Sequence, residues 1–354
     1  MKVLLGWELG AGQGHIQRLV ALAQRLTLYG CVPVFALKSQ NLKGMDFPYQ
    51  SVAAPRLPFS GREDSYTFAD ILATFGFNQA DLLSTHLQNW QEIIKSINPD
   101  LVITDHAPGL VLAARGRVPV VVIGSHFAVP PPVEVFPPFR FPAPPESAER
   151  QMRVSETVRQ VVGLDTPLGQ VFNGDRSFIF SIPELDCYRA WRQPAQNDQY
   201  VGIHVAPLPR RNGSTTGKNW TYLASDYRFR DLVFSMVGTE PEFKPLQEAL
   251  IDKSIAIHHG GLTTAIACLL AGIPQLILPR YIEQQLNAIA LSKLEVAQML
   301  IAPTFENLQI AQTQVSHLSG NALRLAEQLF DWNQNFLDRI VADCLQYGSC
   351  QSIT

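Results

Sequence analysis

The sequence predicts an α/β protein with two domains, each built on a parallel sheet with helices on both faces. Its 354 residues exceed the length at which a single hydrophobic core usually stops growing, about 250–300 residues. Apolar strands alternate with helical patterns in the first half of the chain, and a second alternation begins near residue 219. Strands that alternate with helices pair in parallel, because each crossover helix returns the chain to the same end of the sheet.

The first half opens with a βαβ unit. A short apolar strand over Lys2–Gly6 leads into a glycine-rich turn, and Ile16–Leu28 carries apolar residues at helical spacing before a strand over Cys31–Leu37. The further elements expected in this half are a long helix over Ala80–Ile97, a strand over Pro99–Asp105, a small-residue helix over Gly109–Arg115, and strands over Val118–Ser125 and Ser177–Asp186.

A segment rich in proline and phenylalanine, residues 129–145, interrupts this alternation. It contains eight prolines and three phenylalanines, and proline blocks both helix interiors and sheet ladders, so we expect an extended loop. Two interpretations stay open. The segment is a surface connector, or it is an apolar lip beside a binding cleft that contacts an acceptor or a membrane surface. Under the second interpretation Phe127, Phe136 and Phe139 are acceptor-side candidates, together with Gly14.

Composition excludes several classes of protein. The net charge of −3 gives no basic face for nucleic acid. The five cysteines are scattered without metal-ligand spacing, so we expect no metal site and a reducing compartment. The N-terminus lacks the pattern of a secretory leader, and no apolar run reaches the 18 or so residues of a membrane span. We therefore expect a cytoplasmic protein.

The second half begins after a polar stretch rich in glycine and serine, which is the best candidate for a linker. We expect an N-terminal domain over residues 1–200, a linker over 201–218, a C-terminal domain over 219–330, and a C-terminal segment over 331–354 whose helix packs back on the N-terminal domain. The elements expected here are helices over Phe243–Ile251, Thr263–Ala271 and Glu327–Leu345, and strands over Ser254–Ile257 and Gln275–Leu278.

Two histidines and two glycines lie between the strand that ends at Ile257 and the helix that begins at Thr263. The free amides and the dipole of a helix N-terminus favour anions, notably phosphates. His259 can donate to the same anion, and the hydroxyls of Thr263 and Thr264 add further donors. The alternative is a tight turn followed by a capped helix, with no ligand at all.

Glu283 and Gln284 follow the next strand, so they lie at the same edge of the predicted sheet. A carboxylate beside an amide can bind neighbouring sugar hydroxyls. This edge then offers a diphosphate site and a sugar site side by side.

The complete spacing over residues 257–288 resembles the donor-site signature of nucleotide-sugar glycosyltransferases of GT-B fold, most closely the UDP-glycosyltransferases and their bacterial macrolide- and sterol-type relatives. The family pattern runs His-Gly-Gly, a small or hydroxyl pair, Ala-Gly-x-Pro, Pro and Asp-Gln-x-x-Asn-Ala. The residues that match without a gap are His259-Gly260-Gly261, Thr263-Thr264, Ala271-Gly272-Ile273-Pro274, Pro279 and Glu283-Gln284-Gln285-Leu286-Asn287-Ala288. The resemblance implies diphosphate binding by His259 and the following turn, and sugar binding by Glu283 and Gln284.

The N-terminal half is similar to the same family at Gly14-His15, which implies that His15 is the general base and that Asp105 orients it. The chemistry is reasonable in itself, because a histidine can take the proton of an attacking hydroxyl at neutral pH and an aspartate can fix its tautomer. Two alternatives remain. His15 packs on the strand edge at the start of its helix, and Asp105 caps the helix that follows it.

The resemblance implies two Rossmann-like domains facing across a cleft. It also implies transfer of a sugar from a nucleotide-diphosphate sugar, with UDP-sugar expected, to a hydroxyl of a small acceptor, without a cofactor. In-line displacement inverts the anomeric centre, and a helix N-terminus with His259 can stabilise the leaving diphosphate without a metal. The proline- and phenylalanine-rich segment indicates that the acceptor is apolar. Two alternatives stay open: a GT-B hydrolase or epimerase of nucleotide sugars, and a non-catalytic relative that binds them. The second is suggested by a shortened Pro207–Leu250 region and by Ala267 and Cys268, which stand where many members carry a ribose-binding acid.

Overall fold

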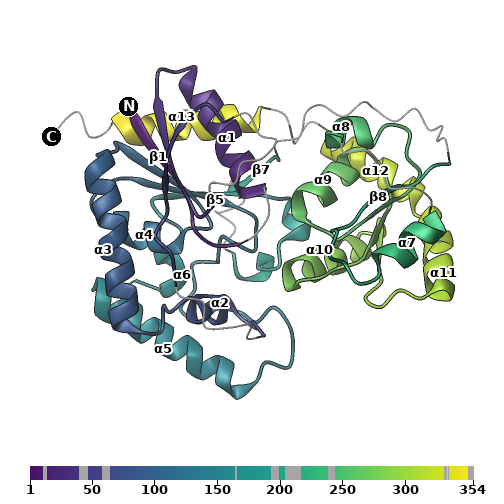
Figure 1. The fold of residues 1–354 in the computed structure, drawn as a ribbon, viewed down its shortest axis with the longest axis horizontal. Helices are drawn as coiled ribbons and strands as arrows, with labels where there is room; N and C mark the ends of the chain where they lie inside the picture. Colours follow the sequence, from purple (N-terminus) through teal and green to yellow (C-terminus); the bar gives the residue numbers. More distant parts are fainter. Residues whose placement is uncertain are drawn as a thin grey trace. The chain divides into compact units, whose positions relative to one another are not determined.

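The computed structural model describes residues 1–10, 14–39, 47–57, 64–163, 166–192, 199–203, 217–237, 244–330, 333 and 335–349. The chain forms two compact units (Figure 1). The first unit contains Met1–Phe180, Tyr188–Val201 and Asn335–Thr354, and the second contains Ser181–Cys187 and Gly202–Gln334. Most of the predicted linker, residues 204–216, lies outside the described residues.

The first unit is built on a seven-stranded sheet in which all neighbouring strands are parallel, as predicted. The strand order is β3-β2-β1-β4-β5-β6-β7. The bounds are β1 Lys2–Trp7, β2 Val32–Leu37, β3 Gln50–Ala53, β4 Leu101–Asp105, β5 Val120–Gly124, β6 Arg176–Phe180 and β7 Tyr200–Val201. The order reverses between β1 and β4, and in such a sheet this switch point is where ligands bind.

Helices cover both faces of this sheet (Figure 1). Helices α1 and α13 pack together over one face, and α3 and α4 pack together over the other. The helices of the unit are α1 Gly14–Thr27, α2 Phe68–Thr74, α3 Ala80–Ile97, α4 Pro108–Ala114, α5 Pro145–Val162, α6 Leu168–Val171 and α13 Phe336–Ser349, with a short 3₁₀ turn, η2, over Arg189–Trp191. Because both faces are covered, β4 and β5 are buried along their whole length.

The segment over residues 129–145 has no strand or helix before Pro145, as expected of a proline-rich loop. Its interpretation as an exposed aromatic lip is wrong for the three rings proposed as acceptor-side candidates. Phe127 stacks on Phe139 with ring centroids 4.7 Å apart, and Phe136 packs edge-on against Phe68 at 5.3 Å. All three candidates are at least nine-tenths buried, because partners from distant parts of the chain cover them. Within the loop, Phe141 is exposed.

The second unit holds a smaller parallel sheet in the order β11-β10-β9-β8. Its strands are β8 Trp220–Tyr222, β9 Ala256–His258, β10 Gln275–Ile277 and β11 Ala297–Met299. Its helices are α7 Arg230–Val237, α8 Leu246–Ala249, α9 Leu262–Leu270, α10 Ile282–Lys293, α11 Phe305–Ser316 and α12 Ser319–Leu329, with a 3₁₀ turn, η1, over Pro183–Leu185. Within the described residues, none of the helices combines the length and the apolar character needed to cross a bilayer.

Three predicted elements were wrong in extent. The helix predicted over Phe243–Ile251 corresponds to the shorter α8, Leu246–Ala249. The strand predicted over Ser177–Asp186 ends at Phe180, because Pro183 lacks the N–H that a ladder needs and begins η1 instead. The helix predicted over Glu327–Leu345 is interrupted: α12 ends at Leu329 and α13 begins at Phe336. Directly before α13, Asn335 has a φ of +56°, a left-handed conformation that a continuous right-handed helix cannot contain.

Candidate active site

The switch point of the first sheet brings three chain segments together. In the parallel register of β1 and β4, Trp7 pairs with Asp105, so both strands end at the same level. Helix α1 begins at Gly14, a few residues after β1 ends. The side chains at the ends of β1 and β4 and at the start of α1 therefore share one edge of the sheet.

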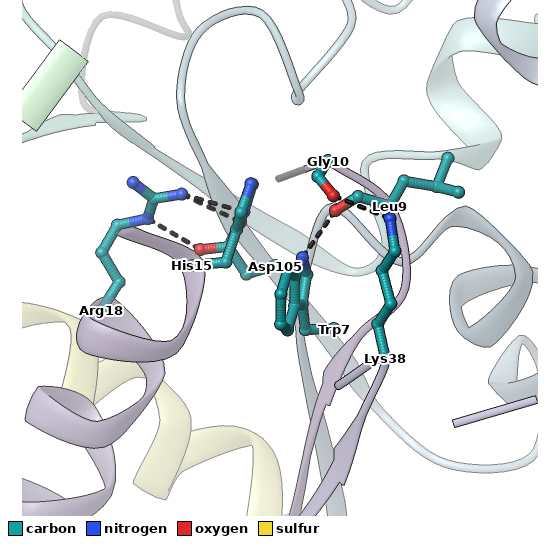
Figure 2. Close-up of polar contacts among 7 residues, drawn as sticks. All are labelled: Trp7, Leu9, Gly10, His15, Arg18, Lys38 and Asp105. Atoms are coloured by element: carbon teal, nitrogen blue, oxygen red, sulfur yellow. Dashed lines mark hydrogen bonds and ion pairs between the residues drawn. The ribbon is translucent and has the colours of Figure 1, made fainter. Parts of the chain in front are cut away.

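His15, Arg18 and Asp105 form a hydrogen-bonded cluster at this edge (Figure 2). His15 Nδ1 lies 2.7 Å from Asp105 Oδ1. Arg18 donates from Nε to Asp105 Oδ2 at 2.7 Å and from Nη2 to Oδ1 at 3.1 Å. Arg18 is three positions after His15, so both side chains lie on the same face of α1. Both carboxylate oxygens of Asp105 are thus occupied.

The charge of Asp105 is determined by these contacts. Burial by itself raises the pKa of this fully buried carboxyl. The charges of Arg18 and His15 and their hydrogen bonds outweigh burial and lower the pKa to about 2. An ionised carboxylate can only accept, so the proton lies on His15 Nδ1 and Nε2 carries the free lone pair. This is the tautomer that a general base needs.

Residue 10 lies so close to the His15 ring that only a glycine fits there. Gly10 has a φ of +83°, and a Cβ atom added there would lie 2.5 Å from His15 Nε2. Lys38 donates from Nζ to the Gly10 carbonyl at 2.8 Å, and Trp7 stacks on the His15 ring with centroids 5.4 Å apart (Figure 2). The imidazole is therefore fixed in position, and its side chain is 13% exposed.

This geometry excludes the alternative for Asp105 and is compatible with part of the alternative for His15. Helix α4 has Ala107 at its N-cap and no side-chain capping bond, so Asp105 does not cap it. His15 does pack on the strand edge through Trp7, but its Nδ1 also pairs with Asp105. Sequence reasoning missed Arg18, although an arginine one turn after the histidine on an otherwise apolar helix face was a usable signal. Gly14 is the first residue of α1.

The second unit folds the His-Gly-Gly turn at the carboxyl end of β9. The Gly260 N–H donates to Nδ1 of His258 at 2.9 Å, and Asn287 Nδ2 donates to the Gly260 carbonyl at 2.9 Å. Burial lowers the pKa of His258 to about 4, so its neutral ring acts as part of the turn. Gly260 has a φ of +86°, and a Cβ atom there would lie 2.6 Å from a methyl carbon of Ile277.

His259 has partners that the sequence did not suggest. Its Nε2 accepts from the Ala224 N–H at 2.9 Å, so the ring proton lies on Nδ1, which donates to the Leu278 carbonyl at 2.7 Å. Burial lowers the pKa of His259. In this arrangement the neutral ring has no N–H left to give to a phosphate, and the diphosphate role of His259 stays a prediction. Through these two hydrogen bonds, the His259 ring connects the segment after β8 with the residues that follow β9 and β10.

The other residues predicted for the donor site do meet at one edge of the sheet. Helix α9 starts after Gly261, which is its N-cap and has no side chain to bond the backbone amides of the first turn. Thr263 and Thr264 lie in that first turn. Glu283 and Gln284 lie in the first turn of α10, and Gln284 Oε1 accepts from the backbone N–H of Arg280 at 2.8 Å.

A pair of charged side chains, Arg280 and Asp226, follows two strands of the same sheet. Arg280 follows β10 and binds both oxygens of Asp226, which follows β8, at 2.8 Å each. The described residues contain no group of three or more His, Cys, Asp or Glu side chains arranged to hold a metal ion. This edge of the second sheet therefore combines helix amides, hydroxyls, a carboxylate and a guanidinium.

Comparison with solved structures finds the same architecture over nearly the whole chain. The glycotransferase of kitacinnamycin has 15% identity and a TM-score of 0.67, with 98% of each chain covered. The glycosyltransferase SnogD from Streptomyces nogalater has 18% identity and a TM-score of 0.61, with 98% of this chain and 99% of its own covered. SsfS6 from Streptomyces sp. SF2575, in complex with thymidine diphosphate, has 16% identity and a TM-score of 0.63, with coverage of 98% and 99%.

No protein-family model matches the sequence, and no curated protein matches it. The identities to the solved structures are low, so the likeness concerns the fold. The chain has two units with parallel sheets, and it aligns with these proteins over nearly its full length. It therefore has the GT-B fold of nucleotide-sugar glycosyltransferases.

Proposed function

We propose that the protein transfers a sugar from a nucleotide-diphosphate sugar to a hydroxyl group of a small acceptor. The observation that carries this proposal is the His15–Asp105 pair at the switch point of the first sheet, in which the bond from Nδ1 to Asp105 leaves the lone pair of His15 on Nε2. The GT-B fold supports it, because that fold is shared with the glycosyltransferases described above. A buried, ionised Asp105 bound to a histidine is costly to maintain, which favours an enzyme over a non-catalytic binding protein.

The proposed reaction is a single displacement. The acceptor hydroxyl gives its proton to His15 Nε2 as its oxygen attacks the anomeric carbon, and the bond to the diphosphate breaks with the electron pair leaving on the diphosphate oxygen. Asp105 stabilises the imidazolium that forms. Attack from the side opposite the leaving group inverts the anomeric centre.

The edge of the second sheet at which α9 and α10 begin supplies the rest of the chemistry in this proposal. The amides at the start of α9 and the hydroxyls of Thr263 and Thr264 bind the diphosphate and stabilise its developing charge, so that neither a metal nor a cofactor is needed. Glu283 and Gln284 bind the sugar hydroxyls. His259 contributes directly only if its ring exchanges the Ala224 amide for a phosphate oxygen.

The nucleotide in the proposal is a pyrimidine nucleoside diphosphate. The resemblance over residues 257–288 favours UDP, and the structure of SsfS6 contains thymidine diphosphate, which differs from UDP in the base and the ribose. The acceptor is proposed to be a small, mainly apolar molecule with a hydroxyl group. This proposal rests on the proline- and phenylalanine-rich composition of residues 129–145, in which Phe141 is exposed.

A thermal-shift comparison tests the donor. Purified protein is incubated with UDP-glucose, dTDP-glucose and, as the matched purine control, ADP-glucose. A ligand present at 100 times its Kd should add about 2.7 kcal/mol to the free energy of unfolding. We expect that gain with at least one pyrimidine donor and less with ADP-glucose. An unchanged melting temperature with all three sugar nucleotides would contradict the proposed donor class.

A further inference from the structure

The ion pair between Arg280 and Asp226 has no part in the chemistry described so far. Asp226 lies four residues after the end of β8, and Arg280 lies three residues after the end of β10. Strand β9 lies between those two strands, with His258 paired to Tyr222 on one side and to Ile277 on the other. The ion pair therefore bridges the end of β9, where the His-Gly-Gly turn leads into α9.

Arg280 is held beside this turn by its own neighbours. Its backbone N–H donates to Gln284 Oε1 at 2.8 Å, and its guanidinium carbon lies 5.4 Å from the centroid of the Tyr281 ring. The first turn of α10 borders the His-Gly-Gly turn, because a Cβ atom added at Gly260 would lie 3.2 Å from the Gln284 carbonyl oxygen. Burial, and then the charge of Arg280, lower the pKa of His259, so the guanidinium lies near that ring.

The two partners of the pair differ in how firmly they are held. The side chain of Arg280 is 22% exposed, whereas that of Asp226 is 71% exposed. Solvent screens an exposed ion pair, so release of the aspartate into water costs little free energy. A guanidinium keeps its charge and binds a phosphate through the same fork of two N–H groups that binds a carboxylate. The exposed carboxylate is therefore the part of the pair that an incoming anion can replace.

A diphosphate at the start of α9 needs a positive partner that the turn itself does not supply. The ring of His259 is neutral, and both of its nitrogens are bonded within the protein. The amides of the first helical turn and the hydroxyls of Thr263 and Thr264 are dipoles without a full charge. Arg280 brings a full positive charge to this edge, and a charge-assisted hydrogen bond is about twice as strong as a neutral one.

We infer that Arg280 binds the diphosphate of the donor, and that Asp226 is the counter-ion that holds this place in the free protein. This inference rests on the proposed function. When the donor binds, phosphate oxygens replace the two carboxylate oxygens of Asp226 on the guanidinium, and the carboxylate turns to solvent. No covalent bond changes and no proton moves in this exchange. The leaving diphosphate gains negative charge as the sugar bond breaks, so its contact with Arg280 strengthens in the transition state.

Calorimetric titration of the protein with inorganic pyrophosphate, UDP and dTDP tests this exchange. Arg280→Gln should raise the Kd of each probe about tenfold, because one charge-assisted contact is lost. Asp226→Asn should lower the Kd about three- to fivefold, because the guanidinium no longer gives up a carboxylate when the anion binds. A gain in affinity cannot result from damage to the fold, so the second variant keeps the test decisive.

Two neighbouring residues provide matched controls for the change in charge. The guanidinium of Arg228 lies over the Phe229 ring, 4.3 Å from its centroid, and Asp231 lies in the first turn of α7. We expect Arg228→Gln and Asp231→Asn to change the three Kd values less than about twofold, because salt screens exposed charges that do not touch the ligand. Controls that match the effects of Arg280→Gln and Asp226→Asn would overturn the inference. So would an unchanged Kd in either of those two variants, or a wild-type protein that binds none of the three probes.

These titrations separate the inference from the proposed function, because they need neither an acceptor nor turnover. Transfer is measured separately, from UDP-glucose or dTDP-glucose to the phenol probe 4-methylumbelliferone. The expected shifts in Kd in a protein without transfer would support diphosphate binding by Arg280 and count against the transferase proposal alone. Transfer by a protein whose two variants bind pyrophosphate like the wild type would refute the role of Arg280 and leave the proposed function intact.

Discussion

Arg18 holds both oxygens of Asp105, and this contact keeps a charged carboxylate inside the first unit. Removing one partner of a buried ion pair strongly destabilises the folded protein, because the remaining charge stays buried without a partner. The same helix provides a matched contrast. Arg25 also binds both oxygens of an aspartate, Asp338, at 2.5 and 2.7 Å, but these side chains are 41% and 37% exposed.

This contrast predicts two different losses of stability. Arg18→Gln should lower the free energy of unfolding by about 3–5 kcal/mol, because it leaves the Asp105 charge buried. Arg25→Gln should lower it by less than about 1 kcal/mol, because solvent screens the exposed pair. Urea unfolding at neutral pH measures both. Equal losses would show that burial of Asp105 does not control the strength of its pair.

Asp105 also predicts how stability depends on pH. Its pKa is about 2 in the folded protein and about 3.9 in an unfolded chain. A depressed pKa stabilises the folded state above the unfolded value, and this contribution is lost as the pH falls through the folded value. The loss should amount to about 2 kcal/mol between pH 4 and pH 2. Urea unfolding across that range should show a smaller loss in Asp105→Asn, and identical curves for the two proteins would contradict the assignment.

At the scale of the elements, the turn between β9 and α9 depends on one of its two glycines. Gly260 has a φ of +86° and almost no room for a Cβ atom, whereas Gly261 has a φ of −57° and no atom within 4 Å of such a position. Gly260→Ala should cost about 2–4 kcal/mol through backbone strain and overpacking against Ile277. Gly261→Ala should cost less than about 1 kcal/mol. Urea unfolding of both variants measures these losses in the free energy of unfolding. Equal losses for the two variants would contradict the strain assigned to Gly260.

The order of strands and helices was predictable because periodicity is a local property of the sequence. Helix α3 was predicted with its observed bounds, Ala80–Ile97, and the strand predicted over Pro99–Asp105 differs from β4 by two residues. The burial of Phe136 and Phe139 was not predictable, since it depends on Phe68 and Phe127, which pack there only in the folded chain. The composition of a loop does not show which partners cover it.

The same holds for the candidate site, where local patterns were predictable and contacts between distant segments were not. His15 and Asp105 were expected at one sheet edge, because strands that alternate with helices end there. Arg18 was missed because an arginine one turn after His15 does not by itself show which side chain it binds, and its partner Asp105 belongs to another strand. The contacts of His259 with Ala224 and Leu278 were missed for the same reason, since they join segments 35 and 19 residues apart.

At the scale of the whole molecule, the two units carry different parts of the proposed chemistry. The first sheet has seven strands and holds the dyad at its switch point, whereas the second has four strands and holds the residues predicted for the donor. Loss of the base should therefore affect turnover and leave donor binding intact, because the two functions depend on residues of different units.

The most direct test of this account is the single-turnover rate of sugar transfer by His15→Ala, with 4-methylumbelliferone as acceptor and donor affinity measured by calorimetry. We expect the rate to fall about 10²- to 10⁴-fold while the donor Kd stays close to that of the wild type. Adding Asp105→Asn should cost little more, because the two residues act as a unit. A folded His15→Ala protein that transfers sugar at the wild-type rate would contradict the role of His15 as the general base.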